Sequence, residues 1–203
     1  LASGFISSIA TISAMGALSA KAPNVLAAAT IFQMAAVLGA TSVTTLRALS
    51  VPLISAGVAA VAYGAVFTFR ALQEKTEHEP QQGRAFSLLT AAEFALILSG
   101  ILVASAMLRE WFGEAGIILI AAVAGFVDTH SPAISIASLV AAGKINAADA
   151  VIPILATFTT NMISKMIFAQ TSGGTSFALR VIPGLILVAF AAWASAIQLL
   201  ARP

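Results

Sequence analysis

Asp128 and His130 are the residues of this chain whose types and spacing most directly suggest chemistry. They lie two residues apart in Phe126-Val-Asp-Thr-His-Ser-Pro132, a polar interruption in an otherwise apolar region. A carboxylate at the centre of a membrane helix costs about 2.5–3.5 kcal/mol on insertion scales, so one kept there usually lines a cavity or a proton relay. His130 could accept a proton or, when charged, stabilise the Asp128 anion. A broken helix also frees backbone groups to meet an ion. The pattern favours an ion-binding or solute-binding site.

A purely structural role would explain the same residues. Ser131 could cap a helix that begins at Pro132, because serine is a favoured cap and proline is tolerated in the first turn. Asp128 would then lie in a solvated loop at the membrane interface. The sequence leaves both interpretations open.

Asn161 and Lys165 form a second polar pair, four residues apart and therefore on one helix face. A lysine inside a membrane needs a carboxylate partner, which Asp128 or Glu93 could supply. Alternatively, Lys165 extends its amine to a nearby interface. Glu93 itself either faces other helices as a proton or cation ligand or reaches the headgroup region.

No arrangement typical of an enzyme is present. The sequence has no cysteine, no Gly-x-Ser-x-Gly and no His-x-x-x-His, and its two histidines lie in unrelated settings. We therefore expect no catalytic activity and no cofactor, and the identity of any bound metal is left open. There is also no basic run with interleaved aromatic residues, so we expect no nucleic-acid partner.

Composition places the chain in a lipid bilayer. Of its 203 residues, 60% are hydrophobic and 9% are charged, with a mean hydropathy of +1.00. Three long stretches contain no charge at all: 50–69, 94–108 and 181–201. Because about 20 apolar residues in a helix cross a bilayer core, these stretches predict membrane-spanning helices. Alternating ten-residue strands are absent, which favours helices over a barrel.

The hydrophobic pattern occurs twice. Gly4-Phe5 and Gly125-Phe126 open similar stretches, and Val51-Pro52-Leu53 has a counterpart in Ile182-Pro183-Gly184-Leu185. Two copies of a hydrophobic unit are typical of transporters, with the site between them. We divide this single membrane domain into a first repeat (about 1–70), a loop (71–85), an extra helix (86–108) and a second repeat (about 112–203). The stretch of the first copy that matches the region of Asp128 contains hydroxyl side chains, namely Ser7, Ser8 and Thr11, and no carboxylate.

Helix ends follow from the prolines and polar turns. Pro52 and Pro183 are read as helix starts, each preceded by an interfacial arginine, Arg47 or Arg180. Two short segments could each cross only half of a core of about 30 Å. If every segment spans the membrane, the second copy is inverted relative to the first. If the short segments are re-entrant, the number of membrane crossings between the two copies changes, and so does this orientation. The predicted helices cover about 5–20, 25–48, 51–70, 86–108, 115–127, 132–143, 146–170 and 177–201.

The stretches Gly125-Phe-Val-Asp128-Thr-His130-Ser-Pro-Ala133 and Thr160-Asn161-Met-Ile-Ser-Lys165 resemble the C-terminal membrane domain of bacterial inner-membrane proteins of the MgtC/SapB type. That domain is of unknown function. The resemblance implies a multi-pass location in the inner membrane and an upstream membrane domain in the same chain. His130 stands where the family's Asp-x-Asp pattern has its second carboxylate, which argues against a two-carboxylate cation site.

We therefore predict an all-α, polytopic transmembrane bundle with an inverted internal repeat and short broken helices. The leading function is movement of a small ion or solute by alternating access, with Asp128 and Lys165 buried and coupled. The alternative is a regulatory module that binds a partner protein or lipid, keeps its polar residues at the interface and acts through the 71–85 loop. The oligomeric state is left open.

Overall fold

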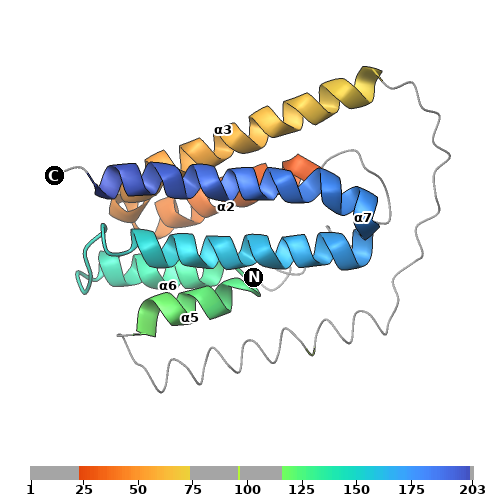
Figure 1. The fold of residues 1–203 in the computed structure, drawn as a ribbon. Helices are drawn as coiled ribbons and strands as arrows, with labels where there is room; N and C mark the ends of the chain where they lie inside the picture. Colours follow the sequence, from red (N-terminus) through yellow and green to blue (C-terminus); the bar gives the residue numbers. More distant parts are fainter. Residues whose placement is uncertain (1–22, 74–95, 97–115, 202–203) are drawn as a thin grey trace.

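The described part of the chain consists of helices joined by turns (Figure 1). The computed structural model describes residues 23–73, 96 and 116–201. Within these residues there is no strand, which confirms the all-α prediction. The helices expected over 5–20 and 86–108 lie outside the described residues. The helices are α2 (Pro23–Thr41), α3 (Val43–Gln73), α5 (Ile117–Gly125), α6 (His130–Ala141) and α7 (Val151–Leu200).

The turn between α2 and α3 lies at Ser42, so the predicted boundary near residue 50 is wrong. The Ser42 hydroxyl accepts the backbone N–H of Thr45 at 3.3 Å and lies 2.9 Å from the Thr45 hydroxyl. This is the bond by which a serine cap starts a helix. Pro52 is therefore buried inside α3 and does not begin it. Arg47 does not precede a helix start, contrary to the prediction.

α2 and α3 pack against each other as an antiparallel hairpin. A Cβ built on Gly39 would lie 3.3 Å from Leu46, and one built on Gly57 would lie 3.9 Å from Ile31. Residues of α2 close to the turn thus contact residues of α3 close to the turn, and residues of α2 farther from the turn contact residues of α3 farther from it. The two helices run in opposite directions.

α7 is also a hairpin, made of a first arm (Val151–Thr171) and a second arm (Gly174–Leu200). The chain turns at Gly174, whose φ of 72° lies in the left-handed region that glycine adopts without strain. Trp193 Nε1 donates a hydrogen bond of 2.8 Å to Thr159 Oγ1 across the hairpin. Pro183 lies inside the second arm, so the prediction that it starts a helix behind Arg180 is also wrong.

Among the described residues, three helices are long and apolar enough to cross a membrane: Val43–Val66 and the two arms of α7. Large apolar side chains on these helices point outward, including Ile54, Val58, Leu179 and Phe190, each more than 60% exposed. Such a surface suits contact with lipid chains rather than with water. The protein is a membrane protein.

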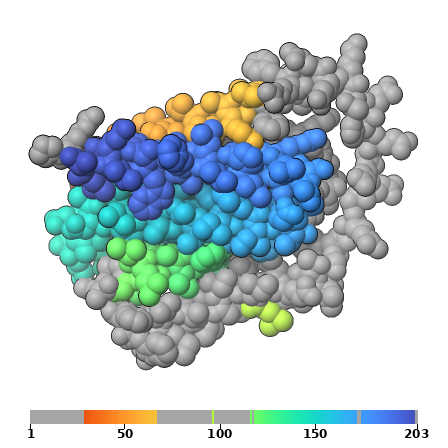
Figure 2. Space-filling model, viewed as in Figure 1, coloured from red at the N-terminus to blue at the C-terminus, as the bar shows by residue number. Residues whose placement is uncertain are grey.

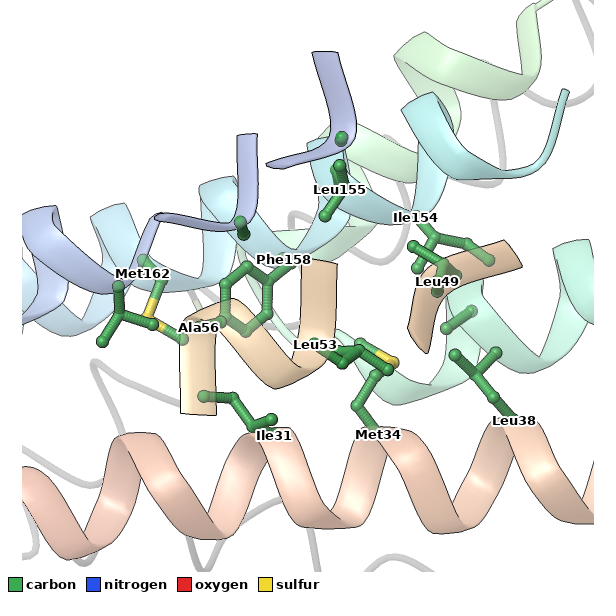
Figure 3. Packing of buried hydrophobic residues seen from close by; sticks show 14 of the residues in the cluster. Ile31, Met34, Leu38, Leu49, Leu53, Ala56, Ile154, Leu155, Phe158 and Met162 are labelled. Carbon is green, nitrogen blue, oxygen red and sulfur yellow. The ribbon is translucent and has the colours of Figure 1, made fainter. Parts of the chain in front are cut away.

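The part of the core labelled in Figure 3 lies where α2, α3 and the first arm of α7 meet. Along α2 the order Leu38, Met34, Ile31 lies opposite the order Ile154, Phe158, Met162 along α7, so α2 and the first arm are antiparallel. All six of these residues are at most 7% exposed. The close packing of this core fixes the depth of the polar residues on α7 relative to α2.

α3 and the second arm of α7 are antiparallel as well. Tyr63 Oη donates to the Arg180 carbonyl oxygen at 2.9 Å, near the end of α3 and the beginning of the arm. Val51, near the beginning of α3, lines a small cavity with Gln198 and Leu199 from the end of the arm.

α5 and α6 are short helices separated by a break at residues 126–129, close to the predicted interruption. They contain nine and twelve residues, which correspond to about 14 and 18 Å at 1.5 Å per residue. α5 packs along the first arm of α7 (Figure 2). α6 runs back beside α5 and ends at Ala141. A short loop through Gly143 (φ 69°) then leads into α7 (Figure 1). α5 and α6 form a hairpin with the break at its tip.

Candidate functional site

Asp128 caps α6 from inside the protein. Its Oδ1 accepts the backbone N–H of His130 at 3.0 Å and its Oδ2 accepts that of Ser131 at 2.6 Å. A carboxylate at a helix N-terminus is stabilised by the unpaired N–H groups and by the helix dipole. Asp128 is 7% exposed. The alternative of a Ser131 cap with Asp128 in a solvated loop is therefore wrong.

Side chains of α7 bind the backbone carbonyls that the break leaves free. Asn161 Nδ2 donates to the Gly125 oxygen at 3.2 Å, and Ser164 Oγ donates to the Phe126 oxygen at 2.8 Å. These two bonds hold the tip of the α5–α6 hairpin against the first arm of α7. Ser164 was not among the predicted site residues. Its position three residues after Asn161, on the same helix face, was the available signal.

Gly125 permits the closest approach of α5 to α7. A Cβ at this position would overlap the Thr160 hydroxyl and the Thr157 carbonyl oxygen, and it would lie 2.7 Å from Thr157 Cα. No side chain other than hydrogen fits here. Gly125, which opens the second of the two similar hydrophobic stretches in the sequence, thus has a steric role at the site.

Lys165 is buried at the contact between α2 and α7. Its side chain is 1% exposed, and its Nζ donates a 2.7 Å hydrogen bond to Thr30 Oγ1 on α2. The prediction that Lys165 could extend to an interface is therefore wrong. Asp128 is near enough to attract the ammonium electrostatically, but no described carboxylate lies within 4.0 Å of it.

Three buried polar atoms around the break have no hydrogen-bond partner among the described residues: Thr129 Oγ1, His130 Nδ1 and Thr157 Oγ1. Thr129 is 1% exposed and Thr157 is fully buried. Leaving a buried polar group unpaired costs about 1–3 kcal/mol. Such atoms are explained most simply by a bound water or a polar ligand.

The structure brings four of the predicted site residues to one region: Asp128 and His130 at the break, and Asn161 and Lys165 on the facing arm of α7. The other four, Glu93, Ser7, Ser8 and Thr11, lie outside the described residues. No group of three or more His, Cys, Asp or Glu side chains in the described segments could hold a metal ion.

Comparison with family models matches residues 1–173 to a domain of unknown function (DUF4010). Comparison with curated proteins and with solved structures gives no match. The family model covers the break between α5 and α6, the turn at Ser42 and the whole first arm of α7. The chain belongs to the DUF4010 family of domains of unknown function.

Proposed function

We propose that this domain moves a small ion or solute across the membrane through the polar site at the break between α5 and α6. The observation that carries the proposal is a helix break held against buried polar residues of a membrane-spanning arm. Non-helical backbone at membrane depth is tolerated only where it is buried in protein or lines a cavity. Broken helices of this kind form the substrate sites of many secondary transporters.

The depth of the site supports a transport role. Asn161 is the eleventh residue of the 21-residue arm Val151–Thr171. Ten residues beyond Val151 correspond to about 15 Å, half of a hydrocarbon core of about 30 Å. Lys165 lies one further turn along. An ionisable residue at this depth usually belongs to a substrate or ion pathway.

Helix directions support an inverted repeat, one of the arrangements that serve alternating access. The repeat equates α2 with the first arm of α7 and α3 with the second arm. α2 is antiparallel to the first arm (Figure 3), and α3 is antiparallel to the second arm. Pro52 and Pro183 are each the tenth residue of their spans, Val43–Val66 and Gly174–Leu200. Two halves in opposite orientation can expose one central site to either side in turn.

The regulatory alternative predicts a different location for the same polar residues. A regulator would keep its polar side chains at the interface, whereas Asp128, Asn161 and Lys165 are 7%, 5% and 1% exposed. Burial of all three favours transport. The location in a bacterial inner membrane and the upstream membrane domain as an intramolecular partner belong to this proposal, and they rest on the sequence resemblance to MgtC/SapB-type proteins.

The test is flux through the full-length protein in proteoliposomes, measured for K⁺, Na⁺, Mg²⁺, Cl⁻ and protons. We expect flux of at least one of these above that of protein-free vesicles. Lys165→Met should reduce it by about a hundredfold, because losing a buried charge from a site costs a few kcal/mol. Lys144→Met, at an exposed loop position, is the matched control and should leave flux unchanged. Equal flux through the Lys165→Met variant and the wild type would contradict the proposal.

A further inference from the structure

We infer that Lys165 is the binding site of a coupling proton, carried as the ammonium of its own side chain at the contact between the two halves. The inference rests on the proposed transport function and names its coupling ion. Lys165 belongs to the first arm of α7 and Thr30 to α2, which are helices of different halves. Their 2.7 Å hydrogen bond therefore joins the halves directly at a buried position.

The surroundings of Lys165 raise the free energy of its buried ammonium, so the ammonium can release its proton. An ammonium has three donors, and the described partner of Lys165 is a neutral hydroxyl. Both carboxylate oxygens of Asp128 are engaged by the N-terminus of α6. A buried charge without a direct counter-ion is expensive. Lys165 thus differs from a lysine fixed permanently in an ion pair.

Among the described residues, few other charged groups lie around Lys165. Asp128 and His130, at the break, interact with it electrostatically. α2 carries no charged residue over Pro23–Thr41. Arg180 is the only other charged residue of α7, and it is exposed beyond the turn at Gly174. Within the described part of the chain, the protonation state of Lys165 therefore changes the net charge at the contact between α2 and α7 by one unit.

The proton step follows from this geometry. As the ammonium, Lys165 holds α2 and α7 together through Thr30 and is attracted by Asp128. When the halves open to one side, an N–H bond of the ammonium breaks and the proton passes to water on that side. The nitrogen keeps the electron pair as a neutral amine. Reprotonation from water on the other side restores the ammonium, so that one proton is moved per cycle.

The test measures opening of this contact as a function of pH. In the full-length protein without other cysteines, Ala169→Cys places a thiol one turn from Lys165 at a fully buried position. The protein is held in nanodiscs and labelled with a membrane-impermeant methanethiosulfonate. Lys144→Cys, at an exposed loop position, gives the reference rate at each pH and corrects for thiol ionisation. Lys165→Arg and Lys165→Met are each combined with the Ala169→Cys reporter.

We expect the corrected labelling rate to rise by about tenfold from mildly acidic to mildly alkaline pH, since a charge-assisted hydrogen bond across the contact is weakened. The Lys165→Arg variant keeps its charge at every pH, so its rate should stay low and flat. The Lys165→Met rate should stay high and flat. A flat wild-type rate, or an equal rise in the Lys165→Arg variant, would overturn the inference.

Flux measurements distinguish a failure of this inference from a failure of the proposed transport function. Solute flux together with a flat wild-type labelling rate overturns proton coupling at Lys165 and leaves transport standing. A rise in labelling that depends on Lys165, without flux of any tested species, supports the proton site and overturns transport.

Discussion

Replacing Gly125 by alanine should destabilise the protein by about 3 kcal/mol, the upper part of the range for overpacking a tight contact. The added methyl group would overlap the Thr157 carbonyl oxygen and lie 2.7 Å from Thr157 Cα. These are backbone atoms of a packed helix, so they cannot rotate away as a flexible side chain would. Relief requires α5 to move away from α7, which would break the Asn161 bond to the Gly125 carbonyl.

Gly57→Ala is the matched control for this prediction. Gly57 also lies inside a helix, but the nearest atom to a Cβ there is Ile31 Cγ2 at 3.9 Å, an ordinary contact. Alanine is favoured over glycine in a helix by up to about 1 kcal/mol, so this variant should be at least as stable as the wild type. Denaturant unfolding in one detergent, followed by tryptophan fluorescence, compares the variants. A Gly125→Ala variant as stable as Gly57→Ala would show that α5 does not contact α7 as described.

Replacing Asp128 should separate the structural role of this side chain from its charge. Asp128→Ala removes both acceptors of the α6 cap and the carboxylate that attracts Lys165. Loss of a cap costs about 0.5–2 kcal/mol, and the ammonium of Lys165 also loses its electrostatic attraction to Asp128. We therefore expect Asp128→Ala to lose about 2 kcal/mol of stability, the upper part of the range for a cap. Asp128→Asn keeps an acceptor for the cap and should lose less.

The order of the two Asp128 variants in the same unfolding assay is the decisive result. Asp149→Ala is the control, because Asp149 is exposed, pairs only with Asn146 among the described residues, and should change stability by less than about 0.5 kcal/mol. If Asp128→Ala and Asp149→Ala were equally mild, Asp128 would not be the buried cap of α6. If Asp128→Asn retained full flux, the carboxylate charge would have no part in transport.

The helical class, the membrane setting and the broken segment could be predicted from the sequence. Long runs without charge predict spans wherever the backbone must satisfy its own hydrogen bonds. The polar residues around Asp128, with Gly125 before and Pro132 after them, correctly predicted two short helices. These features depend on local sequence alone, and for that reason composition and spacing were sufficient.

The turn at Ser42 and the contacts of the site could not be predicted in the same way, whereas the gap between the predicted helices 146–170 and 177–201 does contain the turn at Gly174. Pro52 and Pro183 are as compatible with a first turn as with a bend inside a long helix. The cap at Ser42 and the left-handed turn at Gly174 decide between the two. The depth of Lys165 depends on Thr30, 135 residues away in the sequence. Periodicity places residues on a helix face, but it does not identify the helix opposite.

The central claim is that two halves of opposite orientation enclose one polar site, and the sidedness of their equivalent turns tests it most directly. Thr44, next to the turn at Ser42, and Thr175, next to the turn at Gly174, are both exposed. The two turns lie at opposite ends of the helical bundle (Figure 1). Single Thr44→Cys and Thr175→Cys variants of the full-length protein would be labelled with a membrane-impermeant thiol reagent in intact cells and in inverted vesicles. The account predicts that one position is labelled only in cells and the other only in inverted vesicles. Labelling of both positions from the same side would contradict it.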